Sequence, residues 1–334
     1  MNQKKFFILT KTPLRVSFFG GGTDLPNFFN KKFGHVISSS INRYVYTSIK
    51  SHDNLFTESY RLNYSITEHV DGNINKIKNN LIRSCLKFLN IKENMHITIS
   101  TDIPSMSGLG SSSSIIVGLL KALHVYKKKK ISTKKLAEIA CKIEIDIMKN
   151  PIGKQDQYSA VYGGFNSFKF YRGNKVFVQK LKKTIIKKIF QNLIFIWVGN
   201  FKESKKILKD QNKKISKRRK YYDDLLKLTA LSKKMISREN FNLNKFGKLL
   251  DKNWVLKKKL SESISNNKID YIYNKCLRNG SIGGKILGAG SGGFLLIVVN
   301  KNKKAKLMRL LKSYKIYSFS NTDKGVEVLY KIFY

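Results

Sequence analysis

The stretch "IPSMSGLGSSSSIIVGLL" at residues 103–120 sets two glycines and four consecutive serines directly before an apolar segment. The preceding "HITIS" (96–100) alternates like a strand, and the spacing after it predicts a helix over Ser112–Tyr126. Glycines let a backbone approach a ligand closely, and a helix N-terminus presents unpaired N–H groups. The pattern is typical of an anion-binding loop, and an ordinary turn with a serine N-cap is the alternative. The Gly-Lys-Ser/Thr ending of the Walker loop is missing, which argues against that class.

A second glycine cluster follows an apolar strand near the N-terminus, in "TPLRVSFFGGGTDLPNF" (12–28). The strand carries Arg15, and Asp24 stands just beyond the three glycines. Three glycines after a strand favour a tight turn in which side chains would clash with a ligand. Asp24 can then accept hydrogen bonds from sugar hydroxyls; a hairpin with a capping aspartate is the alternative.

A third cluster, in "GGKILGAGSGGFLLIVV" (283–299), has four glycines within Gly288–Gly293 and runs into a buried strand. A linker between lobes would not usually lie so close to so much apolar sequence. A glycine-rich hairpin or bulge is the alternative. The apolar run "FLLIVV" (294–299) is far too short to span a bilayer, so we expect no membrane span.

Two carboxylates occur in "EIDIMKNPIGKQDQYSAVYGG" (144–164). Glu144 is expected near the end of a helix over Thr133–Met148, with Ser132 as its N-cap; Asn150-Pro151 ends that helix. Asp156 is expected in the loop beyond. Such a pair can serve one site, one acid for a metal and one for a hydroxyl proton, whereas solvated surface acids are the alternative. Because 65 Lys and Arg stand against 21 Asp and Glu, two acids near a glycine-bearing loop carry extra weight.

The remaining segments alternate strands and helices without strict βαβα order, which predicts an α+β fold. A break near Asn200–Lys209 is the predicted boundary between two lobes. The expected strands are Phe6–Leu9, Leu14–Phe19, Ile41–Lys50, a hairpin over 163–181 with its turn at Arg172–Asn174, 192–199, Lys285–Leu287, Phe294–Val299, Lys315–Ser318 and Gly325–Tyr330. The other expected helices are Ile74–Leu89, Asn212–Ile236, Phe241–Ser263, Lys268–Asn279 and Lys303–Ser313.

Composition restricts the class of protein. The 334 residues carry a formal charge of +44, which favours an anionic partner. The lysines are spread along the chain, which indicates a compositional bias more than a nucleic-acid surface, so we expect no nucleic-acid partner. Three distant cysteines show no metal or disulfide spacing, and the N-terminus lacks the pattern of a secretory signal. A cytoplasmic location fits best.

Together and in this order, the three glycine segments resemble the signature segments of the GHMP kinases, at residues 12–24, 104–114 and 283–293. The forms "PLRVSFFGGGTDLP", "NPIGKQDQY" and "GGKILGAGSGGF" look most like the sugar-kinase branch of this family. The resemblance implies a two-lobed fold. Residues 1–200 would form an N-terminal lobe like ribosomal S5 domain 2, and residues 201–334 a ferredoxin-like C-terminal lobe, with ATP between them.

The resemblance also implies roles for residues. Asp156 would face the acceptor hydroxyl with Arg15 beside it, and Ser112 and Glu144 would hold Mg²⁺. The nucleotide phosphates would lie against Gly108, Leu109, Gly110, Ser111, Ser112 and Ser113, and the substrate against Gly21, Gly22, Asp24, Gly290 and Gly292.

The implied activity is phosphoryl transfer from ATP, with Mg²⁺, to the anomeric 1-hydroxyl of a heptose 7-phosphate, which would feed polysaccharide biosynthesis. A kinase for an unphosphorylated sugar such as fucose or galactose is the alternative within enzymes. A basic nucleic-acid-binding protein is the alternative from another class; it predicts steeply salt-dependent binding and leaves the glycine loops and Asp156 unexplained. Oligomeric state is not predicted.

Overall fold

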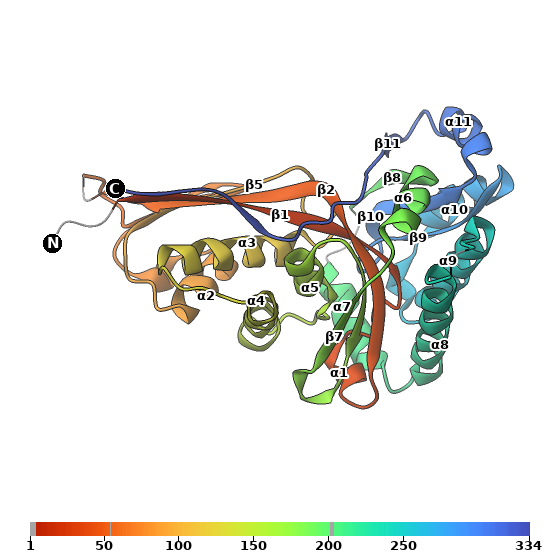
Figure 1. Cartoon of the computed structure of the whole chain (residues 1–334), viewed down its shortest axis with the longest axis horizontal. Coiled ribbons are helices and arrows are strands. Elements are labelled where there is room, and N and C mark those ends of the chain that lie inside the picture. The colour runs from red at the N-terminus through yellow and green to blue at the C-terminus, as the bar shows by residue number, and fades with distance from the viewer. Residues whose placement is uncertain (1–4, 54, 201–203, 239) are drawn as a thin grey trace.

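The computed structural model describes residues 5–53, 55–200, 204–238 and 240–334, and its strands form two sheets (Figure 1). The strands of the larger sheet are β1 (Phe6–Phe19), β2 (Gly34–Ser51), β3 (Tyr60–Asn63), β4 (Thr67–Val70), β5 (Met95–Thr101), β6 (Phe165–Phe170), β7 (Val176–Lys180) and β12 (Glu327–Phe333). Those of the smaller sheet are β8 (Leu193–Asn200), β9 (Ser281–Ile286), β10 (Gly292–Val299) and β11 (Lys315–Tyr317). The larger sheet has the order β12-β1-β2-β5-β3-β4, with β6 pairing to β2 and β7, and the smaller has the order β11-β8-β10-β9.

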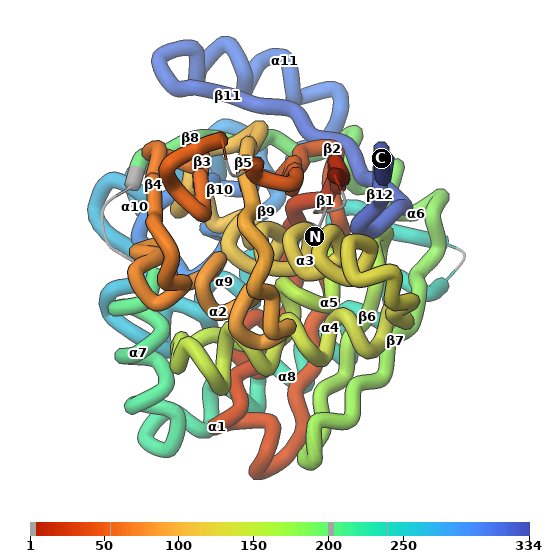
Figure 2. Tube along the Cα trace, turned by 90° about the vertical axis from the view of Figure 1, so that its left-hand side faces the viewer, coloured from red at the N-terminus to blue at the C-terminus, as the bar shows by residue number. Residues whose placement is uncertain are grey.

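Helices cover both sheets, so the chain has the predicted α+β composition. The helices are α1 (Pro26–Phe29), α2 (Asn80–Phe88), α3 (Ser111–Tyr126), α4 (Thr133–Cys141), α5 (Gln155–Tyr162), α6 (Lys183–Gln191), α7 (Ser204–Lys214), α8 (Arg219–Ile236), α9 (Leu243–Lys258), α10 (Asn267–Arg278) and α11 (Lys301–Leu310). Short turns are η1 (Ile74–Lys76), η2 (Lys142–Ile147), η3 (Arg172–Asn174) and η4 (Glu262–Ile264). Figure 2 shows α11 and β11 at one margin of the molecule.

The two strands predicted at Phe6–Leu9 and Leu14–Phe19 are one long strand, β1. Its pairing with β2 shifts register between Pro13 and Leu14, which lets the proline stand inside the strand. Gly118 brings α3 close to this strand: a Cβ there would lie 2.7 Å from Thr12 Oγ1. This close packing fixes α3, and the loop before it, against β1.

Three helix predictions need correction. The helix expected at Ile74–Leu89 starts later, as α2. The Asn79 side chain caps it by accepting hydrogen bonds from the backbone N–H groups of Leu81 and Ile82. The helix expected at Asn212–Ile236 is interrupted between α7 and α8, where Ile215 turns into the core. The helix expected at Thr133–Met148 begins with the predicted Ser132 cap but passes into the π-helical turn η2.

Three apolar clusters hold the sheets and helices together. One lies between the larger sheet and α2–α5, and another between the smaller sheet and α7, α9 and α10. The cluster between them joins the end of β1 to α9, where the rings of Phe18 and Phe246 lie 5.7 Å apart and those of Phe19 and Phe246 5.5 Å apart. The two sheets therefore share a continuous packed interface beside the first glycine segment.

The strand pairing crosses the expected lobe boundary. β8 belongs to the smaller sheet, whereas β12 returns at the end of the chain to pair with β1. Of the predicted break at 200–209, residues 201–203 lie outside the described part of the chain, and residues 204–209 are helical in α7. The division into 1–200 and 201–334 stays a proposal.

Candidate active site

The loop between β5 and α3 turns through two glycines into a helix N-terminus. Gly108 and Gly110 have φ of 81° and 80°, in the left-handed region, and Gly110 is the N-cap of α3. A Cβ at Gly110 would lie 3.3 Å from both Arg15 Cζ and Asp156 Oδ2. The first N–H groups of a 16-residue helix thus start beside a charged pair. This is the arrangement that an anionic ligand requires.

Arg15 on β1 and Asp156 on α5 form a bidentate pair. Nε donates to Oδ1 at 2.7 Å and Nη2 to Oδ2 at 2.6 Å, while Nη1 donates to the Gly108 carbonyl at 2.5 Å. The Arg15 side chain is 5% exposed and that of Asp156 24% exposed, so the carboxylate alone is accessible from outside. Asp156 was expected in a loop, but it stands in the first turn of α5. The helix fixes the carboxylate more firmly than a loop would.

Glu144 is buried beneath the start of α3. Its carboxylate accepts hydrogen bonds from the Ser112 and Ser113 hydroxyls and from Gln157 Nε2, each at 2.7 Å. Burial raises the pKa of Glu144, and these three donors oppose that shift. The π-helical turn η2 aims this carboxylate toward α3.

The Ser112 hydroxyl in the first turn of α3 and the buried Glu144 carboxylate beneath it are oxygen ligands of the kind that Mg²⁺ prefers. That ion is usually held by one or two carboxylates together with substrate phosphates and water. Ser112 Oγ and Glu144 Oε1, in mutual contact, supply such a donor set. Among the described residues, no group of three or more His, Cys, Asp or Glu side chains is arranged to hold a metal ion without such help.

Asp24 is turned into the protein. Its Oδ1 accepts from the Gly22 N–H at 2.9 Å and its Oδ2 from the Gln155 N–H at 3.2 Å. Gly153 is required here, because a Cβ would lie 1.9 Å from Asp24 Oδ2. Burial raises the pKa of Asp24. The carboxylate therefore ties the first glycine segment to the start of α5.

The third glycine segment meets the anion-binding loop. A Cβ at Gly288 would lie 2.5 Å from the Cα of Gly108, and one at Gly293 2.3 Å from the Ser107 carbonyl. The backbone of Phe294 donates to that same carbonyl at 3.1 Å. Gly292 lies beside this contact at the start of β10. Gly290 packs on Ile264 instead, since a Cβ at Gly290 would lie 2.7 Å from the Ile264 carbonyl oxygen. Two of the three segments are thus in direct backbone contact.

Two buried lysines also reach this region, and the sequence did not single them out. Lys257 on α9 donates to the Gly288 carbonyl at 2.7 Å. Lys285 on β9 donates to the carbonyls of Ser17 and Phe18 at 2.9 and 3.2 Å. Burial lowers the pKa of Lys257 to about 8 and that of Lys285 well below its usual value. Lys285 could have been predicted to be buried, because it stands inside the apolar, glycine-rich segment "GGKILG". Nothing in the sequence distinguishes Lys257 from the other lysines.

Buried polar atoms without a hydrogen-bond partner gather around Gly21 and Gly22. A Cβ at Gly21 would lie 3.4 Å from Ser17 Oγ and 3.6 Å from Gln155 Nε2. A Cβ at Gly22 would lie 3.5 Å from Tyr222 Cε1 and 3.7 Å from Gln211 Oε1. Within the described residues, the unpartnered atoms here are Ser17 Oγ, Gln155 Oε1, Gln211 Oε1 and Tyr222 OH. Unpartnered buried polar groups are rare in folded proteins, and these fit the hydroxyls of a polar ligand.

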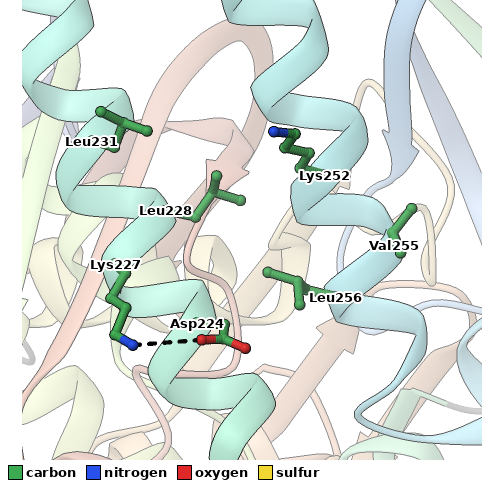
Figure 3. Close-up of a pocket in the computed structure, with 7 residues that line it drawn as sticks. All are labelled: Asp224, Lys227, Leu228, Leu231, Lys252, Val255 and Leu256. Carbon is green, nitrogen blue, oxygen red and sulfur yellow. Dashed lines mark ion pairs between the residues drawn. The ribbon is translucent and has the colours of Figure 1, made fainter.

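A groove between α8 and α9 lies apart from these residues (Figure 3). Its lining contains none of the predicted site residues and consists of Asp224, Lys227, Leu228, Leu231, Lys252, Val255 and Leu256. Within the part of the chain that the structure describes, no helix is both long enough and apolar enough to cross a bilayer.

Comparison with known proteins agrees with this geometry. Two family models match, the GHMP kinases N terminal domain over residues 79–164 and the GHMP kinases C terminal over residues 233–314. A D-glycero-alpha-D-manno-heptose 7-phosphate kinase from Campylobacter jejuni is 31% identical over 96% of this chain and 98% of its own. The chain belongs to the GHMP kinases.

Other GHMP kinases are also similar to this chain in sequence or in fold. The mevalonate kinase of Methanocaldococcus jannaschii is 30% identical over 72% of this chain and 73% of its own. A crystal structure of a D-glycero-D-manno-heptose 1-phosphate kinase from Bacteroides thetaiotaomicron superposes with a TM-score of 0.79, covering 97% of this chain and 99% of that one. At 22% identity the latter shows the fold, which confirms the predicted GHMP kinase fold. The protein is thus a phosphotransferase of a family of ATP-dependent kinases.

Proposed function

We propose that this GHMP kinase transfers the γ-phosphoryl group of ATP to the anomeric 1-hydroxyl of D-glycero-D-manno-heptose 7-phosphate, giving the 1,7-bisphosphate. The heptose 7-phosphate kinase of C. jejuni supports this acceptor. The observation that carries the proposal is the Arg15–Asp156 pair, whose carboxylate lies 3.3 Å from where a Gly110 Cβ would stand. An acid fixed beside a phosphate loop is what in-line transfer to a hydroxyl needs.

Backbone N–H groups of the loop and of the first turn of α3 would bind the β- and γ-phosphates. The residues proposed for this are Gly108, Leu109, Gly110, Ser111, Ser112 and Ser113. Ser112 and Glu144 would hold Mg²⁺, which when bound neutralises charge on the phosphates. The ATP would lie between the lobes proposed at 1–200 and 201–334, where Gly288 meets Gly108.

Asp156 would accept a hydrogen bond from the 1-hydroxyl and take its proton as the oxygen attacks. Both carboxylate oxygens are engaged by Arg15, and each keeps further capacity to accept a hydrogen bond. Arg15 thereby fixes the direction in which the carboxylate faces.

The sugar would lie along the first glycine segment. The unpartnered atoms of Ser17, Gln155, Gln211 and Tyr222 support this placement, because a polyol supplies both donors and acceptors. Asp24 would act on the sugar through the Gly21–Gly22 backbone that it holds, and Gly290 and Gly292 would shape the third segment around it.

The chain's charge of +44 would draw anionic substrates to the site without any role for nucleic acid. Its three cysteines are free and buried, as a reducing compartment favours, so we place the reaction in the cytoplasm. The product would feed the synthesis of nucleotide-activated heptose for a surface polysaccharide.

A coupled assay of ADP release tests the acceptor. Heptose 7-phosphate, mannose, fucose and galactose are compared at equal concentration with Mg²⁺ and ATP. We expect kcat/KM to be highest for heptose 7-phosphate. A higher kcat/KM for an unphosphorylated sugar would replace the proposal with the alternative of a fucose or galactose kinase.

A further inference from the structure

Lys257 brings a buried ammonium group from α9 to the meeting point of the three glycine segments. Lys257 is 5% exposed, and its Nζ donates a hydrogen bond to the carbonyl of Gly288, in the third segment. A Cβ at Gly21, in the first segment, would lie 3.6 Å from the same Nζ. Gly288 in turn packs on Gly108 of the phosphate loop, with 2.5 Å between its ideal Cβ and the Gly108 Cα. The Lys257 side chain thus contacts the third glycine segment at Gly288 and lies near the first at Gly21. Gly288 alone separates it from Gly108 of the second segment.

In the part of the chain that the structure describes, Lys257 has no carboxylate paired with it. None of the ion pairs found within the described residues includes Lys257, and its one hydrogen bond there is to a neutral carbonyl. An ammonium group has three donors, so two remain for a ligand. Holding an unpaired charge inside a protein is costly, and such groups are usually completed by a partner or a ligand.

The surrounding charges show which partner fits. The charges of Asp24, Arg15 and Asp156 act on Lys257, which in turn acts on its neighbour Lys285. Arg15 and Asp156 neutralise each other, and Asp24 is engaged by backbone N–H groups. Neither carboxylate forms an ion pair with Lys257 in the described part of the chain, so an anion brought by the substrates can bind the donors of Lys257 that Gly288 leaves free.

We propose that Lys257 binds the phosphoryl group while it is transferred and is a catalytic residue supplied by the second lobe. In the step, the acceptor oxygen bonds to the γ-phosphorus and its proton passes to the Asp156 carboxylate. The bond from that phosphorus to the bridging oxygen breaks, and its electron pair leaves on ADP. Lys257 stays protonated and donates to a non-bridging oxygen. The inference rests on the proposed phosphate loop and on Asp156, and is independent of which sugar accepts the group.

The reacting phosphoryl group is preferred over the acceptor's own phosphate because of position. Lys257 lies next to Gly288, which contacts the phosphate loop, and it experiences the charges of Asp156 and Arg15 at the reacting end of the site. A phosphate at carbon 7 would lie at the opposite end of the sugar from the hydroxyl that attacks.

The test compares Lys257→Met with Lys259→Met, in which an exposed lysine two residues away is changed in the same way. Methionine fills the space of the lysine stem without its charge, and thermal unfolding checks that both variants fold. Isothermal calorimetry measures the affinity for Mg²⁺–ADP alone and with beryllium fluoride, which mimics a phosphoryl group on ADP. Steady-state kinetics with the best acceptor measures kcat and KM.

For Lys257→Met we expect kcat to fall by roughly 10²–10³-fold, the loss that follows removal of one preorganised charge-stabilising donor. In Lys257→Met, beryllium fluoride should no longer tighten the binding of ADP, while the affinity for ADP alone should stay the same. Lys259→Met should match the wild type in both measurements and in kcat. Unchanged kcat and unchanged fluoride-dependent binding would overturn the inference. A rise in KM restricted to phosphorylated sugars would also overturn it and assign Lys257 to the acceptor's phosphate. The binding experiment needs no acceptor, so its outcome is separate from that of the proposed substrate.

Discussion

Arg15 and Asp156, separated by 141 residues, meet through two parallel hydrogen bonds of 2.7 and 2.6 Å. The pair joins β1 to the first turn of α5, and a third hydrogen bond from Arg15 reaches the carbonyl of Gly108. The carboxylate proposed to receive a proton is therefore fixed to the loop proposed to hold the phosphates. Orientation of one relative to the other is set by a rigid guanidinium group.

Asp156→Asn should abolish turnover. The amide cannot take the proton of the acceptor hydroxyl, and loss of a general base typically costs about 10²–10⁴-fold in rate. ATP binding should change little, because the phosphates are held by backbone N–H groups. Single-turnover kinetics and calorimetry measure the two effects. Asp146→Asn, at an exposed position on η2, is the control. Near-wild-type turnover in Asp156→Asn would refute the catalytic assignment.

Glu144→Gln should weaken the response to Mg²⁺. The amide keeps the size of the side chain and loses the charge that would hold the ion, so the Mg²⁺ concentration for half-maximal activity should rise by about tenfold or more. Thermal unfolding checks that the variant folds, because the new Nε2 can only donate a hydrogen bond where Glu144 accepts them from Ser112, Ser113 and Gln157. A Mg²⁺ titration of activity makes the measurement. An unchanged Mg²⁺ requirement would contradict the assignment of Glu144 as a ligand.

Gly108→Ala should impair the enzyme far more than its backbone strain explains. Gly108 has φ of 81°, and a Cβ there would lie 2.6 Å from the Leu287 carbonyl. Gly72 has φ of 63° but has nothing within 4 Å of an added Cβ, so Gly72→Ala imposes similar strain without the clash. We expect Gly72→Ala to cost about 1–2 kcal/mol of stability and to keep its activity. Equal effects of the two variants on ATP affinity would show that the contact between Gly108 and the third segment is unimportant.

Acid should destabilise the fold through His35. Burial, with the nearby charges of Lys169 and Lys233, lowers the pKa of His35 from 6.5 to about 4. Between these pH values the unfolded chain binds a proton that the folded chain does not, so stability falls as pH falls through this window. The full shift corresponds to about 3 kcal/mol. Denaturant unfolding of wild type and His35→Gln at pH 7 and pH 4.5 measures it.

The His35→Gln variant should lose less stability on acidification than the wild type. An identical pH dependence in wild type and His35→Gln would show that His35 is not the group responsible.

Activity should decline in alkali through Lys257. Burial lowers the pKa of this ammonium group to about 8, although the charges of Asp24 and Asp156 oppose the shift. As pH rises through this value, the free enzyme loses the charge that would meet the phosphoryl group, so kcat/KM should fall. A pH profile of kcat/KM from 6.5 to 9.5 measures the decline. A profile that stays flat to pH 9.5 would contradict the role of Lys257.

The glycine segments could be read from the sequence because each needs a residue without a side chain. Gly108 admits the backbone of Leu287, and Gly293 admits that of Ser107. Glu144 is predicted correctly near a helix end, whereas its π-helical turn forms among contacts with α2 and hydrogen bonds from α3 that local sequence does not specify. The short helix that carries Asp156 was missed, because eight residues after a proline-containing loop become helical only through their tertiary contacts.

Lys257 illustrates a different limit. In a chain with 65 Lys and Arg, "LKKKL" at 256–260 gives no reason to separate one lysine from its neighbours. Lys257 is buried while Lys259 is exposed, because α9 packs on β9 and residues two positions apart on a helix face different directions. The hydrogen bond to Gly288 also joins residues 31 positions apart. The sequence therefore predicts the backbone elements of the site but not the side chain that another helix brings to it.

Product analysis tests the central proposal most directly. The protein is incubated with Mg²⁺, ATP and heptose 7-phosphate, and the sugar product is examined by phosphorus and proton NMR. We predict a bisphosphate with one new phosphorus resonance coupled to the anomeric proton. Failure to phosphorylate heptose 7-phosphate, with turnover of fucose or galactose under the same conditions, would contradict the proposal.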